Sequence, residues 1–124
     1  MSSFASGFKA LSDLTRVRAL KAVLSADEPV CVCELADALQ LPQYQVSKHL
    51  AILRQAGLVA DSRTGTWVYY SISPNASEFV LKLYELIRNE VRGSVFDADE
   101  VRLNARLGMR QDGRCVIGPT RRPR

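Results

Sequence analysis

The chain has 124 residues, 47% of them hydrophobic and 24% charged, which is the balance of one globular domain and excludes a large multidomain enzyme. No apolar run approaches the roughly 18 residues of a membrane-spanning helix. The formal net charge of +4 is concentrated in residues 110–124, which hold five Arg against a single Asp. Residues 1–109 carry equal numbers of basic and acidic side chains, so any nucleic-acid surface there must be a local patch. The first residues lack the pattern of a secretory signal, so we expect a cytoplasmic protein with no membrane partner.

The first half of the chain predicts four helices. Apolar spacing and helix-capping residues place them at residues 3–11, 14–25, 33–40 and 42–56. Asp13 is a suitable N-cap for the second helix, Pro42 suits the first position of the fourth, and Gly57 ends it. Barely two residues separate the third and fourth helices, so they must cross steeply. This layout is a helix-turn-helix.

After Gly57 the hydrophobic period changes from helical to β. Residues 58–60 and 67–72 are β-rich runs, and residues 61–66 between them are typical of a hairpin turn. A helix-turn-helix followed directly by a β-hairpin is a winged helix. The predicted fold is therefore mostly α with a β-hairpin wing.

A strongly amphipathic helix is predicted from Asn75 or Ala76 to Arg92. Its apolar stripe is wide for a helix with little chain left to cover it, and we interpret this stripe, together with Phe4 and Phe8, as a homodimer interface. The alternative is that the helix folds back on its own core. The stripe comprises Phe79, Val80, Leu83, Leu86, Ile87 and Val91.

These elements divide the chain into two parts. Residues 1–92 are predicted to form a winged helix-turn-helix domain for DNA binding and dimerisation. Residues 93–124 are predicted to form a loosely ordered C-terminal extension, with a weak helix around residues 99–107.

The fourth helix has the composition of a reader of the DNA major groove. With Val46 inward, helical geometry places Tyr44, Ser47 and Lys48 on the outer face. The wing tip adds side chains suited to phosphate or minor-groove contact. The alternative for the helix is a merely solvated face. Trp67 and Tyr69 of the wing are candidates for contact with the DNA backbone, and the alternative for them is a position in the core. The predicted DNA contacts are Tyr44, Gln45, Ser47, Lys48, His49, Arg54, Arg63, Thr64 and Thr66.

Several stretches together resemble the bacterial ArsR/SmtB family of metal-sensing repressors, most closely the arsenic-sensing type. They read LSDLTRVRAL at residues 11–20, CVCEL at 31–35, VSKHLAILRQAGLV at 46–59 and GTWVYYSI at 65–72. The resemblance covers about residues 8 to 90. It implies a winged-helix homodimer that binds an imperfect inverted repeat in double-stranded operator DNA and leaves it when metal binds.

The segment from Cys31 to Leu35 resembles the thiolate site of arsenic and of cadmium/lead sensors. The resemblance implies that Cys31 and Cys33 are ligands for As(III) or Sb(III), and soft thiolates suit such ions. In a continuous helix these two residues would lie about 200° apart, so sharing one ion would need a non-helical or unwound first turn. We therefore expect ligand binding to distort the start of the third helix. The alternative is that both are small, buried helix-start residues.

The sequence departs from the arsenic-sensor pattern at Ala36, where that pattern has a third Cys. The remaining thiol is Cys115, which we predict to complete the site from its own or the partner subunit; the alternative is a tail thiol without a ligand. An odd number of cysteines in a reducing compartment argues against a disulfide scaffold. No His follows His49, which excludes the family's zinc site on the terminal helix. His49 itself is expected to form a hydrogen bond or contact DNA rather than bind metal.

The predicted function is a repressor that dissociates from DNA on binding arsenite or antimonite, with no organic cofactor. An alternative keeps the fold but makes the thiols a Cd(II)/Pb(II) site or a sensor of oxidation or reactive sulfur. A distant alternative is a small thiol oxidoreductase. That enzyme would need a Cys-x-x-Cys motif near a βαβ unit or a base beside its nucleophile, and the sequence predicts neither.

Overall fold

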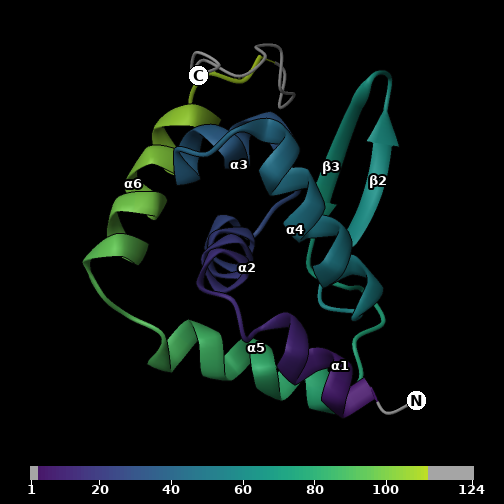
Figure 1. Ribbon diagram of the computed structural model, residues 1–124. Helices are drawn as coiled ribbons and strands as arrows, with labels where there is room; N and C mark the ends of the chain where they lie inside the picture. Colours follow the sequence, from purple (N-terminus) through teal and green to yellow (C-terminus); the bar gives the residue numbers. More distant parts are fainter. Residues whose placement is uncertain (1–2, 112–124) are drawn as a thin grey trace.

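The computed structural model describes residues 3–111, and these form six helices and three strands. Figure 1 shows α2 near the centre, with α3 and α4 on one side and α1 and α5 on the opposite side. Within the described residues no helix is long and apolar enough to cross a membrane. The elements are α1 (Ser3–Ala10), α2 (Leu14–Ala26), β1 (Val30–Cys31), α3 (Val32–Leu39), α4 (Gln43–Gln55), β2 (Ala60–Thr64), β3 (Trp67–Ser71), α5 (Glu78–Glu90) and α6 (Ser94–Leu107).

The helix-turn-helix consists of α3 and α4, and the expected cap of the preceding helix α2 is confirmed. The Asp13 side chain accepts a hydrogen bond from the Arg16 N–H and begins α2. Pro42 is the N-cap of α4 rather than its first helical residue. On α4, Val46, Leu50 and Leu53 are fully buried, which confirms the inward stripe and leaves the opposite face outward.

The wing is part of a three-stranded antiparallel sheet with strand order β1-β3-β2, not an isolated hairpin. The sequence did not predict β1, because two residues carry no alternating pattern. The predicted turn at 61–66 was too long: β2 continues to Thr64, and only residues 65–66 turn. The side chains of residues 61–64 are polar because this edge strand is exposed to solvent. Gly65 adopts a φ of 62°, a conformation that two-residue hairpin turns favour.

The wide apolar stripe of α5 is divided between core and surface. Val80, Leu83 and Ile87 are buried in the chain's own core. Phe79 is half-buried and makes edge-to-face ring contacts with two α1 residues. A set of apolar side chains on α1 and α5 remains 52–60% exposed: Phe4, Phe8, Leu81 and Leu86.

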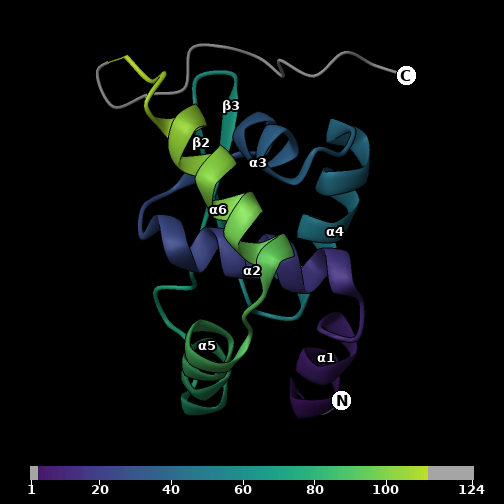
Figure 2. The same cartoon turned by 90° about the vertical axis from the view of Figure 1, so that its left-hand side faces the viewer.

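Helix α6 begins at Ser94, five residues earlier than the weak helix predicted, and packs on α2 and α3. Figure 2 shows it running across these two helices. Leu103 is fully buried, and all eight residues of α3 are buried. The expectation of a loosely ordered extension therefore does not hold for residues 94–107. Cys115 and the rest of the Arg-rich tail, residues 112–124, lie outside the described residues.

Candidate functional site: a thiol pair between the recognition helix, the wing and α6

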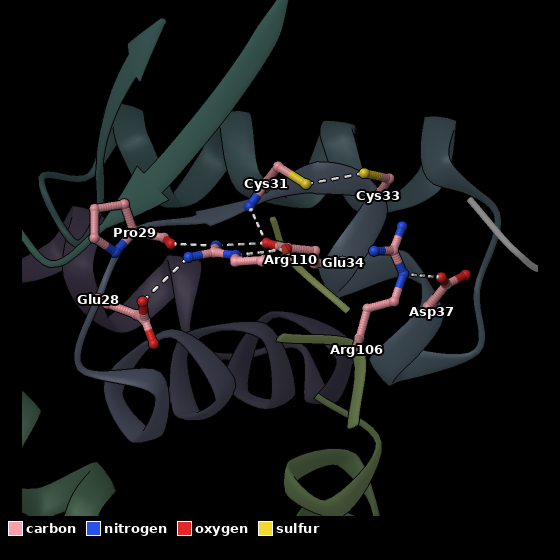
Figure 3. Close-up of polar contacts among 8 residues, drawn as sticks. All are labelled: Glu28, Pro29, Cys31, Cys33, Glu34, Asp37, Arg106 and Arg110. Carbon is pink, nitrogen blue, oxygen red and sulfur yellow. Dashed lines mark hydrogen bonds and ion pairs between the residues drawn. The ribbon is translucent and has the colours of Figure 1, made fainter. Parts of the chain in front are cut away.

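Cys31 and Cys33 lie with their sulfur atoms together. The Sγ–Sγ distance is 2.9 Å, and the two residues are 1% and 2% exposed (Figure 3). Cys31 is the N-cap of α3, with an extended backbone (φ −88°, ψ 162°), and belongs to β1, where it pairs with Tyr69. Cys33 lies in the first turn of α3.

Cys31 has the non-helical backbone that the sequence argument offered as one way to bring the two sulfurs together. The 200° separation applies only where both residues are helical, and here the helix begins after Cys31. The extended residue turns its thiol to the same side as Cys33. The pair is therefore preformed, and no unwinding of α3 is needed to bring the sulfurs together.

A buried carboxylate holds the conformation of Cys31. Glu34, which is fully buried, accepts a hydrogen bond of 2.9 Å from the Cys31 N–H and so completes a capping box. Burial by itself raises the pKa of the Glu34 carboxyl, but hydrogen bonds from Arg110 and Cys31 outweigh it and hold the pKa below its ordinary value. We did not single out Glu34 from the sequence, although a Glu three residues after an N-cap is a recognisable signal.

Arg110, which lies just beyond α6, forms hydrogen bonds on both sides of the segment that carries the thiols (Figure 3). Its guanidinium donates to both Glu34 carboxylate oxygens at 2.7 and 2.8 Å and to the Pro29 carbonyl at 2.7 Å. It also contacts Glu28 at 3.1 Å and lies 5.7 Å from the centre of the Tyr69 ring. The hydrogen bonds to Glu34 and the negative charges of Glu34 and Glu28 raise the pKa of Arg110 above its ordinary value.

A second arginine, Arg106 in α6, pairs with the middle of α3. Arg106 and Asp37 form an ion pair at 2.6 Å, with 4% and 8% of their side chains exposed. Arg102 donates to the Ala38 carbonyl at 2.7 Å. Sequence reasoning missed these contacts, since they join residues more than sixty positions apart.

A cavity of about 250 Å³ lies beside the thiol pair. Its walls come from three elements: the start of α3, the recognition helix α4 and the wing. Ser47 and Thr66, two predicted DNA contacts, therefore share a cavity with the two predicted ligands. The lining includes Cys31, Cys33, Gln43, Ser47, Thr66 and Trp67.

The other predicted DNA contacts lie on α4 and the wing, as expected. Tyr44 is 70% exposed, and the side chains of Lys48, Arg63 and Thr64 are also exposed, whereas Gln45 and Ser47 are half-buried. These positions are compatible with DNA contact and leave it a prediction.

Two predicted DNA contacts have protein partners as well. His49 Nδ1 lies 3.4 Å from a guanidinium nitrogen of Arg16; because a guanidinium only donates, the imidazole accepts through Nδ1. Arg54 lies 4.0 Å from Asp61, an exposed pair of little energetic value.

Among residues 3–111 no cluster of three or more His, Cys, Asp or Glu side chains could hold a metal ion.

Comparison with known proteins agrees with this architecture. Residues 13–61 match the family described as bacterial regulatory protein, arsR family. The chain is 45% identical over 73 residues to the arsenic resistance transcriptional regulator ArsR1 of Pseudomonas putida, covering 59% of this chain and 56% of that protein, so the match spans little more than half of that relative. It is 44% identical over 79 residues to ArsR2 of the same organism, covering 64% of this chain and 68% of that protein.

Other relatives extend the comparison. The arsenical resistance operon repressor of Escherichia coli is 40% identical over 78 residues, which is 63% of this chain and 66% of that protein. The solved structure of HlyU from Vibrio cholerae is similar with a TM-score of 0.62 and 32% identity, covering 73% of this chain and 94% of that chain.

The helix-turn-helix with its adjoining β wing has the architecture of a DNA-binding domain. The matched family and the relatives are transcription regulators rather than enzymes. The chain belongs to the ArsR family of bacterial regulators and is homologous to arsenic resistance repressors.

Proposed function

We propose that this regulator is a repressor that binds operator DNA as a homodimer and leaves it when As(III) or Sb(III) binds to Cys31 and Cys33. The observation that carries the proposal is the preformed thiol pair, with sulfurs 2.9 Å apart, beside a cavity walled by the recognition helix and the wing. Thiolates favour soft, thiophilic ions over Mg²⁺ or Ca²⁺. Relatives named as arsenic resistance regulators favour a metalloid among the soft ions.

The shared cavity supports a route from the ligand to the DNA surface. A metalloid on the two sulfurs adds atoms next to Ser47 of α4 and Thr66 of the wing. DNA recognition needs these two elements in one relative position. A ligand that favours a different spacing lowers DNA affinity, and by linkage bound DNA lowers ligand affinity equally.

Cys115 is proposed as the third ligand that trigonal As(III) needs. Arg110 is hydrogen-bonded to Glu34, which in turn accepts from the Cys31 N–H. Cys115 follows Arg110 by five residues, and five extended residues span at most about 18 Å. This reach allows ligation from the same chain; the alternative source is the partner subunit.

The apolar side chains exposed on α1 and α5 support the proposed homodimer. Phe4, Phe8, Leu81 and Leu86 are each more than half exposed and come from two helices that lie side by side (Figure 1). Large apolar side chains left exposed on neighbouring helices favour an interface there. A symmetric dimer would suit an imperfect inverted repeat, because each half-site then meets one recognition helix.

Thiol oxidation is a second candidate, favoured by the same short Sγ–Sγ distance. Hydrogen peroxide would take two electrons and two protons from the two thiols, forming one S–S bond and releasing two water molecules. The operator would then be released without metal.

Fluorescence anisotropy on an inverted-repeat DNA from the protein's own promoter separates these candidates. Arsenite, Cd(II) and hydrogen peroxide are titrated in turn into the wild-type complex and the Cys115→Ser complex. Release by arsenite supports the proposal, and loss of that release in Cys115→Ser adds the third ligand. Release only by Cd(II) or peroxide refutes the arsenic assignment and supports the corresponding alternative.

A further inference from the structure

The preformed thiol pair depends on one backbone conformation. Cys31 is extended while Cys33 is helical, and this combination puts both thiols on the same side. The Glu34 carboxylate accepts from the Cys31 N–H, which ties the extended residue to the first turn of α3. Whatever holds Glu34 in place therefore also holds the two sulfurs together.

Glu34 needs a partner of its own. It is fully buried, and a buried carboxylate is costly unless it is paired and hydrogen-bonded. Arg110 supplies both functions through two hydrogen bonds, at 2.7 and 2.8 Å, in the fork geometry that guanidinium and carboxylate share. Only 9% of the Arg110 side chain is exposed.

Arg110 also holds the other flank of Cys31. It donates to the Pro29 carbonyl, two residues before Cys31, and it lies over the ring of Tyr69, which pairs with Cys31 in the sheet. The Arg110 side chain therefore contacts three parts of the chain around Cys31: α3 through Glu34, the loop before β1 through Pro29, and β3 through Tyr69.

We propose that Arg110 is a positioning residue of the inducer site, which keeps Cys31 and Cys33 preset for a shared ligand by clamping Glu34 and the Pro29 carbonyl. Arg110 itself touches no ligand. In this account α6 and its end form an integral part of the sensor, not an appendage to the DNA-binding domain. The inference rests on the proposed role of the two thiols as ligands.

Arg106 in α6 offers a matched control for the replacement of Arg110. Arg106 clamps Asp37 of the same helix α3 with a 2.6 Å ion pair, and it is more deeply buried than Arg110. Asp37 lies one helical turn beyond Glu34, and it is Glu34, not Asp37, whose carboxylate accepts from the Cys31 N–H. If Arg110 and Arg106 act only by holding α6 and its end against α3, replacing either arginine should affect ligand binding to the same degree.

The test is an arsenite titration of the full chain without DNA. Binding is monitored through the thiolate-to-arsenic absorption band and, separately, by calorimetry. The variants are Arg110→Met, Arg110→Lys and Arg106→Met, with urea unfolding of each. Groups that orient ligands from outside the coordination sphere typically contribute about 10- to 100-fold to affinity. We expect Arg110→Met to weaken arsenite binding by about that factor, and Arg110→Lys to recover part of the loss because the charge returns without the fork.

Arg106→Met is expected to lower stability at least as much as Arg110→Met while arsenite affinity stays within about threefold of wild type. Equal reductions of affinity in the two Met variants, or an unchanged affinity in Arg110→Met, overturn the positioning role. If Arg110→Met does not fold, Glu34→Gln replaces it, since the amide can still accept from the Cys31 N–H but cannot form the ion pair. If wild type binds Cd(II) and not arsenite, the arsenic assignment fails, and the same comparison with Cd(II) decides the role of Arg110.

Discussion

Truncating Leu103 tests whether α6 is a structural part of the domain. This side chain is fully buried in the main core, while Val101 on the same helix is 68% exposed. Removing a fully buried Leu side chain costs about 2–5 kcal/mol, since transfer free energy is lost and a cavity remains. We therefore expect Leu103→Ala to lower the free energy of unfolding by about 3 kcal/mol and Val101→Ala to change it by less than about 0.5 kcal/mol.

Urea unfolding followed by circular dichroism measures both values. The protein concentration must be the same throughout, because a dimer's stability depends on it. With a typical slope of roughly 1–3 kcal/mol per molar urea, the Leu103→Ala midpoint should fall by at least about 1 M. Equal midpoints for Leu103→Ala and Val101→Ala would show that α6 does not pack on α2 and α3, and the reasoning about Arg110 would fail with it.

Three further predictions concern DNA, assembly and pH. Lys48→Ala should weaken operator binding and reduce the dependence of log affinity on log salt by about 0.9 for each phosphate that the variant no longer neutralises; an unchanged affinity and slope in salt-dependent anisotropy would remove Lys48 from the DNA-binding surface. Phe8→Lys should convert the proposed dimer to a monomer in sedimentation experiments, because it places a charge among the exposed apolar side chains of α1, whereas Lys9→Ala on the same helix should not; a dimeric Phe8→Lys protein would place the interface elsewhere. The pKa of Glu34 lies below its ordinary value of 4.5 in the folded chain, so its stabilising contribution is complete above that pH and is lost as the pH falls through the lower folded value. Glu34→Gln should therefore make stability less dependent on pH in this acidic range, and an unchanged acid-unfolding profile would contradict the assignment.

Local signals in the sequence were sufficient for much of the fold. Asp13 caps α2, Gly57 follows the helix-turn-helix, and the buried spacing of Val46, Leu50 and Leu53 defines the recognition helix. These features depend on residues within a few positions of each other. Capping and hydrophobic periodicity act over the same distance, so they can be read from a sequence.

The candidate site could be predicted only in part. Its two thiols were predicted from the sequence, but the sequence did not show that the extended Cys31, just before α3 begins, already lies with its sulfur beside that of Cys33. Helix ends are the least certain feature of sequence reasoning, and here a single residue decides whether two sulfurs meet. The Arg110–Glu34 contact spans 76 positions, and no local pattern indicates which buried carboxylate an arginine will pair with.

The most direct test of the account is arsenite-induced release of operator DNA by wild type and by Cys33→Ser, measured side by side by anisotropy. Both proteins should bind the operator with similar affinity, because the thiols do not belong to the DNA surface. Arsenite should release wild type and leave Cys33→Ser bound. Normal release of Cys33→Ser by arsenite would contradict the central claim that the Cys31/Cys33 pair is the sensor.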